Sequence, residues 1–116
     1  MIKKNKFKVA PKEQRTLNGK VYASKKEMTY AIKLNSLKKA KRKEDRVVSV
    51  EEQVKFSLDV NGCHICNYIL DFKVYYGDGR IEHIDVKGYT KGTIYRLFKM
   101  KSKLMEAIYG IDVIEV

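Results

Sequence analysis

The stretch YILDFKVYYGDGRIEHIDVK, residues 68–87, decides the fold of this chain. Apolar and polar side chains alternate on both sides of the Gly77-Asp78-Gly79 turn, a pattern typical of two paired β-strands. Apolar residues stay opposite each other only if the strands pair symmetrically about Asp78, because a one-residue shift moves every side chain to the other face. In that register Asp71 lies directly opposite Asp85.

The predicted carboxylate pair carries the strongest chemical signal. Opposed side chains on antiparallel strands start about 5 Å apart, so two negative charges there repel each other, most of all in a partly buried sheet. A cation between them removes the repulsion, and rigidly held carboxylates suit Mg²⁺, which prefers oxygen ligands. Lys87 lies two residues beyond Asp85 and points to the same face. The alternative is a solvated polar face with a simple Lys–Asp ion pair.

The flanking sequence predicts the other elements. Ser24 is a good N-cap for a helix over residues 24–42, and apolar runs predict strands at residues 47–50 and 54–60, before the Asn61-Gly62 turn. A second helix is predicted over residues 94–109, ended by Gly110, with a short strand at 111–116. The order αβββαβ predicts one α/β domain over residues 21–116, with a mixed sheet flanked by helices.

Two charged residues on apolar helix faces each have two interpretations. Glu27 follows Ser24 at the spacing of a capping box, but it also lies in the middle of the apolar stripe, where a carboxylate needs a partner. Lys101 lies in the middle of the second helix's stripe. Its ammonium can reach the solvent at the rim, or it can contact a phosphate near the predicted carboxylates.

Positive charge is concentrated in the first part of the chain. The net charge is +11, and residues 1–46 hold 16 Lys or Arg against 4 Asp or Glu. Such a density favours a nucleic acid as partner over a merely solvated charge run. Residues 1–20 are predicted to be a flexible basic arm, and the expected DNA-binding residues are Lys3, Lys4, Lys6, Lys8, Lys25 and Lys26.

The remaining sequence features exclude some classes of protein. No apolar run is long enough to span a membrane and no secretory signal is evident, so an intracellular protein is expected. Cys63 and Cys66 form a C-x-x-C motif, which is half of a zinc site or a redox pair in other contexts. A structural zinc needs four ligands, and only two histidines are available, so two reduced thiols are the expected state.

Several short stretches together resemble a known family. They are residues 18–27 (NGKVYASKKE), 52–56 (EQVKF), 68–72 (YILDF), 85–88 (DVKG) and 101–104 (KSKL) with 109–110 (YG). In their order and spacing, over residues 18–116, the chain resembles the PD-(D/E)XK nuclease superfamily, and more closely its small phage-encoded Holliday-junction-resolvase-like endonucleases. Leu70 stands at the motif's Pro position, and Asp85 at its Asp-or-Glu position.

The resemblance implies a restriction-endonuclease-like fold and a role for each matching residue. Asp71, Asp85 and the Val86 carbonyl would bind Mg²⁺ or Mn²⁺, with Glu27 a ligand directly or through water. Lys87 would orient or activate the attacking water, and Gln53 would be an accessory polar group.

The expected function is therefore metal-dependent cleavage of branched DNA. A four-way junction needs two symmetric cuts, so a homodimer is expected. The alternatives are a nicking or restriction-type nuclease acting on duplex DNA, and a non-catalytic basic nucleic-acid-binding protein.

Overall fold

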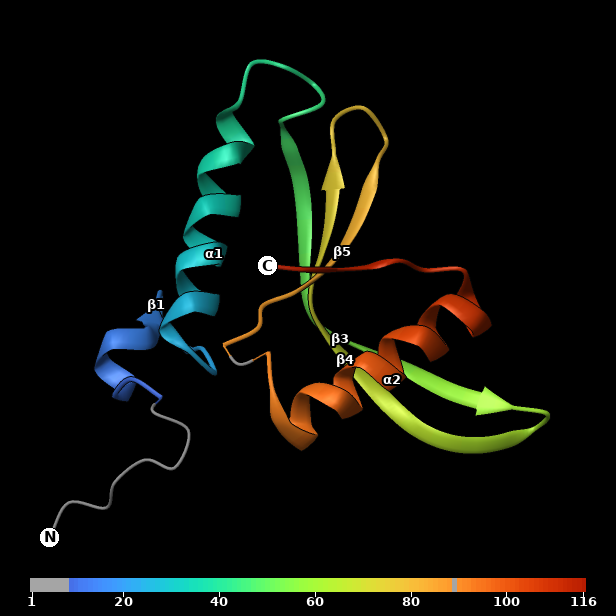
Figure 1. The fold of residues 1–116 in the computed structure, drawn as a ribbon. Coiled ribbons are helices and arrows are strands. Elements are labelled where there is room, and N and C mark those ends of the chain that lie inside the picture. The colour runs from blue at the N-terminus through green and yellow to red at the C-terminus, as the bar shows by residue number, and fades with distance from the viewer. Residues whose placement is uncertain (1–8, 89) are drawn as a thin grey trace, which may run out of the picture.

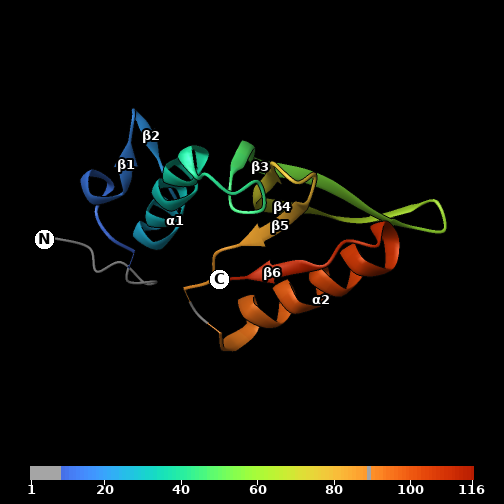
Figure 2. The same ribbon diagram turned by 90° about the horizontal axis from the view of Figure 1, so that it is seen from above.

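The computed structural model of the protein describes residues 9–88 and 90–116, built around a four-stranded sheet in the order β3-β4-β5-β6. The strands are β3 (Val47–Val60), β4 (Cys63–Tyr76), β5 (Ile81–Asp85) and β6 (Val113–Glu115). Helices α1 (Lys25–Ser36) and α2 (Gly92–Tyr109) pack against this sheet (Figures 1 and 2). The predicted α/β fold with a mixed sheet is confirmed.

The register of the central hairpin is the predicted one. Strands β4 and β5 are antiparallel with Phe72 paired to Ile84, and the same register carried one residue further puts Asp71 opposite Asp85. Strand β6 then pairs with β5 in parallel, with Asp85 beside Glu115. The sheet is mixed because the α2 crossover returns the chain in the direction of β5.

Strands β3 and β4 turn sharply at mid-length (Figure 1), and the core divides there into two clusters. Phe72 belongs to the cluster beneath α1, whereas Leu70, on the same side of the pleat, belongs to the cluster beneath α2. At the same level of β3, Gln53 has a left-handed φ of 54°, a conformation that bends a strand. Asp71 therefore lies at the junction of the two clusters.

Helix α1 begins where predicted and ends earlier. The Ser24 side chain caps it by accepting a hydrogen bond from the Glu27 N–H at 3.0 Å. The helix ends at Ser36, and a 3₁₀ turn (Leu37–Lys39) and a loop replace the expected last residues. The reason is that residues 38–43 supply no apolar side chain large enough to hold another helical turn on the sheet.

The other boundaries differ less. The two runs predicted at residues 47–50 and 54–60 form the single strand β3. Helix α2 starts at Gly92, two residues early, and ends at Tyr109, with Gly110 as its C-cap at a φ of 67°. No helix in the described parts of the chain is long and apolar enough to cross a membrane.

The N-terminal region is more regular than predicted. Within the stretch expected to be a flexible arm, the chain forms a 3₁₀ turn (Lys12–Arg15) and the two-stranded hairpin of β1 (Thr16–Leu17) and β2 (Lys20–Val21). The Arg15 guanidinium holds it by donating to the carbonyls of Ala10 and Tyr22. Four predicted DNA-binding residues, Lys3, Lys4, Lys6 and Lys8, lie outside the described residues.

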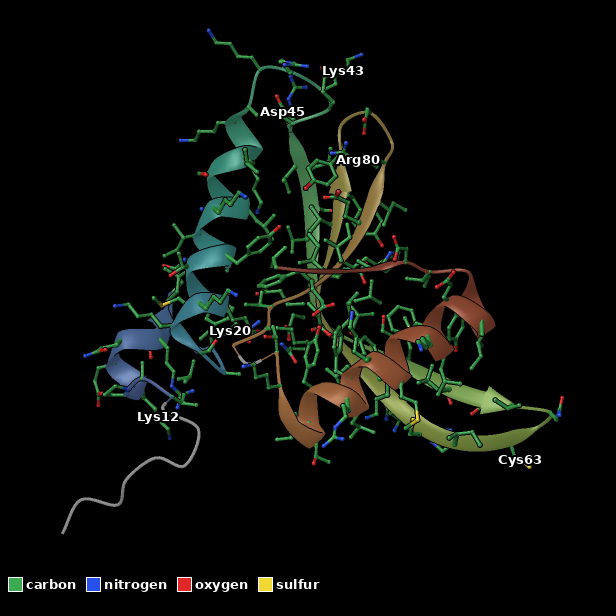
Figure 3. All side chains as sticks on the ribbon, viewed as in Figure 1. Lys12, Lys20, Lys43, Asp45, Cys63 and Arg80 are labelled. Atoms are coloured by element: carbon green, nitrogen blue, oxygen red, sulfur yellow. The ribbon has the colours of Figure 1, made fainter. Side chains whose placement is uncertain are left out.

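The two cysteines lie at the far end of the β3–β4 hairpin, where Figure 3 labels Cys63. Both are free thiols. His64 Nδ1 lies 2.7 Å from Asp59 Oδ1, so this histidine is engaged by a carboxylate rather than by a thiol.

Candidate active site

The two predicted carboxylates lie side by side where β4 meets β5. Asp71 Oδ2 accepts a hydrogen bond from the Val86 N–H at 2.9 Å, which fixes the carboxylate at the end of β5. Burial, together with the adjacent Asp85 carboxylate, raises the pKa of Asp71 from 3.8 to about 8, and Glu27 adds to the effect. Without a cation, the pair therefore favours a bound proton.

Asp85 is almost completely enclosed, with 3% of its surface exposed. Its Oδ2 accepts a short hydrogen bond from the Tyr68 hydroxyl and lies 3.3 Å from the Lys87 ammonium. The Lys87 ammonium also lies 3.8 Å from the centre of the Phe98 ring, on α2. A buried carboxylate needs such partners, and the aromatic ring accepts the cation on its face.

The backbone around Lys87 is held from two directions. The Lys87 N–H donates to the Val116 carbonyl, and the Val116 N–H donates to the Asp85 carbonyl, each at 3.0 Å. On the other side, the Lys26 ammonium donates to the Lys87 carbonyl at 2.7 Å. Lys26, a predicted DNA-binding residue, thus also fixes the segment that carries the site, and both Lys25 and Lys26 are exposed.

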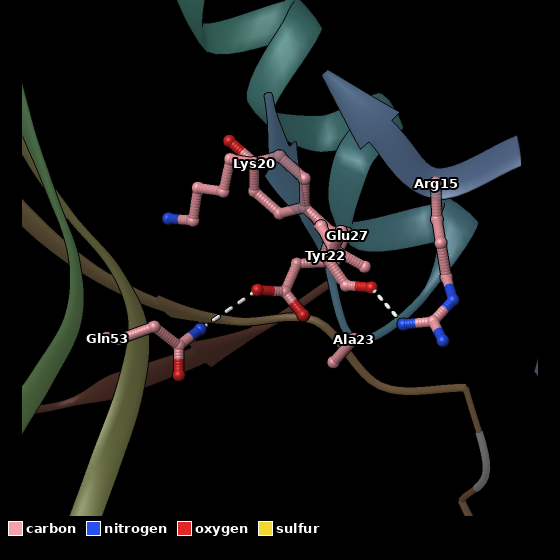
Figure 4. A pocket seen from close by; sticks show the side chains of 7 residues that line it. Arg15, Lys20, Tyr22, Ala23, Glu27 and Gln53 are labelled. Carbon is pink, nitrogen blue, oxygen red and sulfur yellow. Dashed lines mark hydrogen bonds between the residues drawn. The ribbon is translucent and has the colours of Figure 1, made fainter. Parts of the chain in front are cut away.

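Glu27 faces the carboxylate pair rather than its own helix end. It is 5% exposed, and its Oε1 accepts a hydrogen bond from Gln53 Nε2 at 3.0 Å (Figure 4). The same Gln53 nitrogen lies 3.4 Å from Asp71 Oδ1, so one amide connects both carboxylates. Burial raises the pKa of Glu27, while the nearby Lys20 ammonium lowers it. Ser24 therefore caps α1, whereas the Glu27 carboxylate lies in the candidate site.

One cavity lies beside Glu27 and another beside Asp85. The first, of about 280 Å³, is lined on its polar side by Arg15, Lys20, Glu27 and Gln53 (Figure 4). The second, of about 240 Å³, is lined by Asn67, Tyr68, Ile69, Asp85, Lys87, Ile94, Leu97, Phe98 and Lys101. The Lys101 ammonium donates to the Asn67 carbonyl at 3.1 Å at the edge of this second cavity. Each cavity thus has one carboxylate in its lining, Glu27 in the first and Asp85 in the second, together with basic side chains.

The donor set suits a divalent cation of the Mg²⁺ type. Among the described residues, no three His, Cys, Asp or Glu side chains gather closely enough to form a metal site by themselves. Mg²⁺ commonly uses one or two carboxylates and keeps several waters, which matches the Asp71–Asp85 pair. The opposed Asp71 and Asp85 carboxylates support this fit, since a cation between them would offset the repulsion that raises the pKa of Asp71.

The sequence did not predict three partners of the site. Tyr68 donates a hydrogen bond to Asp85, and the Phe98 ring contacts the Lys87 ammonium. Lys20 forms an ion pair with Glu52 at 2.9 Å and lies beside Glu27. By the alternation of β4, the Tyr68 side chain is expected on the same face as the core residue Leu70. The alternation therefore does not predict the hydrogen bond from the Tyr68 hydroxyl to Asp85. Phe98 was identifiable only as a core residue of the second helix.

Comparison with known proteins gives one match. The family model described as "Protein of unknown function (DUF1064)" matches residues 5–113. No curated protein and no solved structure matches the chain significantly.

Proposed function

We propose that this chain, which belongs to the family described as "Protein of unknown function (DUF1064)", is a metal-dependent endonuclease that cleaves branched DNA. The observation that carries the proposal is the opposed Asp71–Asp85 pair, with the Lys87 ammonium 3.3 Å from Asp85. Two adjacent carboxylates with a lysine on the same short segment match the needs of phosphodiester hydrolysis, which are a cation site and a positive charge beside it.

Asp71 and Asp85 would hold Mg²⁺ or Mn²⁺, with the Val86 carbonyl as a further ligand and Glu27 binding directly or through water. When bound, the ion would polarise the phosphate and lower the pKa of a coordinated water. The chain's own residues supply the remaining functions. The segment that carries Asp85 and Lys87 is hydrogen-bonded to Asp71 through the Val86 N–H and to Val116 through its backbone. These bonds keep the site rigid, which electrostatic catalysis requires.

Lys87 is the residue proposed to act on the reacting phosphate. Its ammonium, between Asp85 and the Phe98 ring, lines the second cavity, where a phosphate oxygen gains negative charge during hydrolysis. Lys101 lines the same cavity and is proposed as a further phosphate contact. Gln53 is a positioning residue, because its amide sets the orientation of the Glu27 and Asp71 carboxylates.

A four-way junction is the proposed substrate, recognised through phosphates rather than bases. The basic N-terminal segment and the exposed Lys25 would hold the DNA arms. One site cuts one strand, so symmetric resolution requires a homodimer. The activity would take place inside the cell, in the host cytoplasm if a phage encodes the chain.

Two other functions compete with this one. A nicking or restriction-type nuclease would use the same residues on ordinary duplex DNA. A non-catalytic DNA-binding protein would bind through its basic residues, and the observation on its side is that Asp85 already has protein partners, the Tyr68 hydroxyl and the Lys87 ammonium. In that case the Tyr68 and Lys87 contacts of Asp85 would be purely structural.

Cleavage of a labelled four-way junction and a matched linear duplex, with Mg²⁺, Ca²⁺ or EDTA, tests the proposal. Paired symmetric cuts in the junction with Mg²⁺ alone, lost in Asp85→Asn and retained in the exposed control Asp112→Asn, are the expected result. Equal cutting of both substrates would leave a nuclease without junction selectivity. Tight binding without cutting in either Mg²⁺ or Mn²⁺ would refute the enzyme and favour the binding protein.

A further inference from the structure

The segment between α1 and β3 is the most basic part of the described chain outside the candidate site. It spans residues 37–46, called here the basic loop, and carries Lys38, Lys39, Lys41, Arg42, Lys43 and Arg46. Its acidic residues are Glu44 and Asp45. The loop lies at the end of α1 opposite the carboxylates and beside the β4–β5 turn, where Figure 3 labels Lys43 and Arg80.

The arginines around the loop bind its own backbone and carboxylates. Arg46 donates from Nε to the Ala40 carbonyl at 2.9 Å, and from Nη2 to the Lys41 carbonyl at 2.7 Å. Arg42 pairs with Glu44 at 2.6 Å, and Arg80, from the β4–β5 turn, donates to the Glu44 carbonyl at 2.8 Å. These bonds give an irregular, charged segment a defined conformation.

The loop is also packed closely against the β4–β5 turn. The Gly77 N–H donates to the Arg46 carbonyl at 2.8 Å. A Cβ atom at Gly77 would lie 2.9 Å from the Lys43 carbonyl oxygen, so the approach of the two backbones requires glycine. The loop is therefore fixed to the sheet at two points, the Arg80 side chain and the Gly77 backbone.

The lysines, in contrast, are left free. Lys38, Lys39, Lys41 and Lys43 are exposed, and within the described residues none of their ammonium groups makes an ion pair or a hydrogen bond. Four unpaired charges on a prearranged backbone can bind a polyanion with less loss of conformational entropy than a flexible lysine run. We propose that the basic loop is a second DNA-binding site, which holds the phosphates of a duplex arm away from the cleavage centre.

The position of the loop predicts where on the DNA it binds. Glu27 and Lys39 are separated by the rest of α1 and one 3₁₀ turn. At about 1.5 Å per α-helical residue and about 2.0 Å per 3₁₀ residue, this is roughly 20 Å. Along duplex DNA that distance corresponds to about six base pairs, at about 3.4 Å each. The inference rests on the proposed function and specifies the duplex arm, rather than the branch point, as what the loop binds.

Binding measured in EDTA tests this without any cleavage. The variant K39Q/K41Q/K43Q removes three of the free charges, and K55Q/R96Q/K103Q removes three exposed charges elsewhere. Each phosphate contact contributes about −0.9 to the slope of log K against log salt, so the loop variant should make the slope less steep by about 2.7 and weaken binding by up to ~500-fold at 0.1 M salt. The control variant should keep the wild-type slope.

Arm length provides the second measurement. Wild-type protein should bind a junction with arms of about twelve base pairs more tightly than one with arms of about four, and the loop variant should lose this difference. Equal slopes for the two triple variants, or loss of affinity for an RNA duplex but not for DNA, would overturn the inference. Failure of the nuclease proposal would appear separately, as absence of cutting in Mg²⁺ by a protein that still binds through the loop.

Discussion

Replacing Asp71 with Asn should stabilise the metal-free protein while abolishing cleavage. The pKa of Asp71 rises from 3.8 to about 8 because its carboxylate is desolvated beside Asp85. A carboxyl whose pKa is higher in the folded protein binds more protons when folded, so its ionisation destabilises the fold. The cost is absent below about pH 4, grows as the pH rises towards about 8, and then stays constant.

The size of the effect follows from linkage. A tenfold change in proton affinity corresponds to about 1.4 kcal/mol, so the largest possible loss between about pH 5 and about pH 8 is ~4 kcal/mol. Asp71 is only partly buried, and water offsets some of the desolvation, so we expect about 2–3 kcal/mol. The asparagine in D71N cannot ionise, and its side-chain oxygen can still accept the Val86 N–H.

Urea unfolding followed by circular dichroism in EDTA, repeated across that pH range, measures the effect. The unfolding free energy of the wild type should fall with rising pH, and D71N should fall less and be the more stable protein at about pH 8. Mg²⁺ should recover the loss in the wild type only, since binding to the folded state stabilises it. The exposed control Asp112→Asn should behave as the wild type. Parallel pH profiles for wild type and D71N would refute the reasoning.

Three further predictions concern neighbouring residues. Lys87→Ala should slow cleavage by roughly 10²-fold or more and leave junction binding nearly unchanged, because the lost charge acts at the reacting phosphate; Lys103→Ala is the matched control, and equal losses would contradict the assignment. Gln53→Ala and Gln53→Gly should slow cleavage equally, by about tenfold, but Gly should give the more stable protein in thermal unfolding because the backbone φ is 54°. Gly77→Ala should cost about 1–3 kcal/mol in urea unfolding and weaken DNA binding, because its Cβ would displace the basic loop; Gly88→Ala, where a Cβ meets no atom within 4 Å, should cost less.

The sequence predicted the carboxylate pair because the pairing of β4 with β5 depends on a local signal. The turn at Asp78 and the alternation on both sides of it permit one register, and that register determines which residues are opposed. The sequence alone does not decide the inward position of Glu27, since a capping box and a buried carboxylate share the same spacing. The structure separates the two, because the cap uses the Ser24 hydroxyl and leaves the carboxylate free to meet Gln53.

The partners of the site could not be predicted, because they depend on tertiary geometry. The hydrogen bond from Tyr68 to Asp85 and the contact of Phe98 with Lys87 join different elements, and β3 has the left-handed Gln53 at the level of Asp71. No periodic pattern indicates a left-handed residue inside a strand. The early end of α1 follows from the lack of large apolar side chains in residues 38–43, whereas the hydrogen bond from Arg80 to the Glu44 carbonyl, which stabilises the loop, depends on tertiary geometry.

The backbone clamp between Val116 and the Asp85–Lys87 segment has a consequence for synthesis of the protein. A growing chain leaves the ribosome with its N-terminus first, so both carboxylates leave the exit tunnel before β6 can pair with β5. Until β6 is free, the segment that carries Lys87 lacks the hydrogen bonds that hold it in place. The growing polypeptide can therefore pair Asp71 with Asp85 through the β4–β5 hairpin, but the segment that carries Lys87 gains its hydrogen bonds with Val116 only after β6 has left the ribosome.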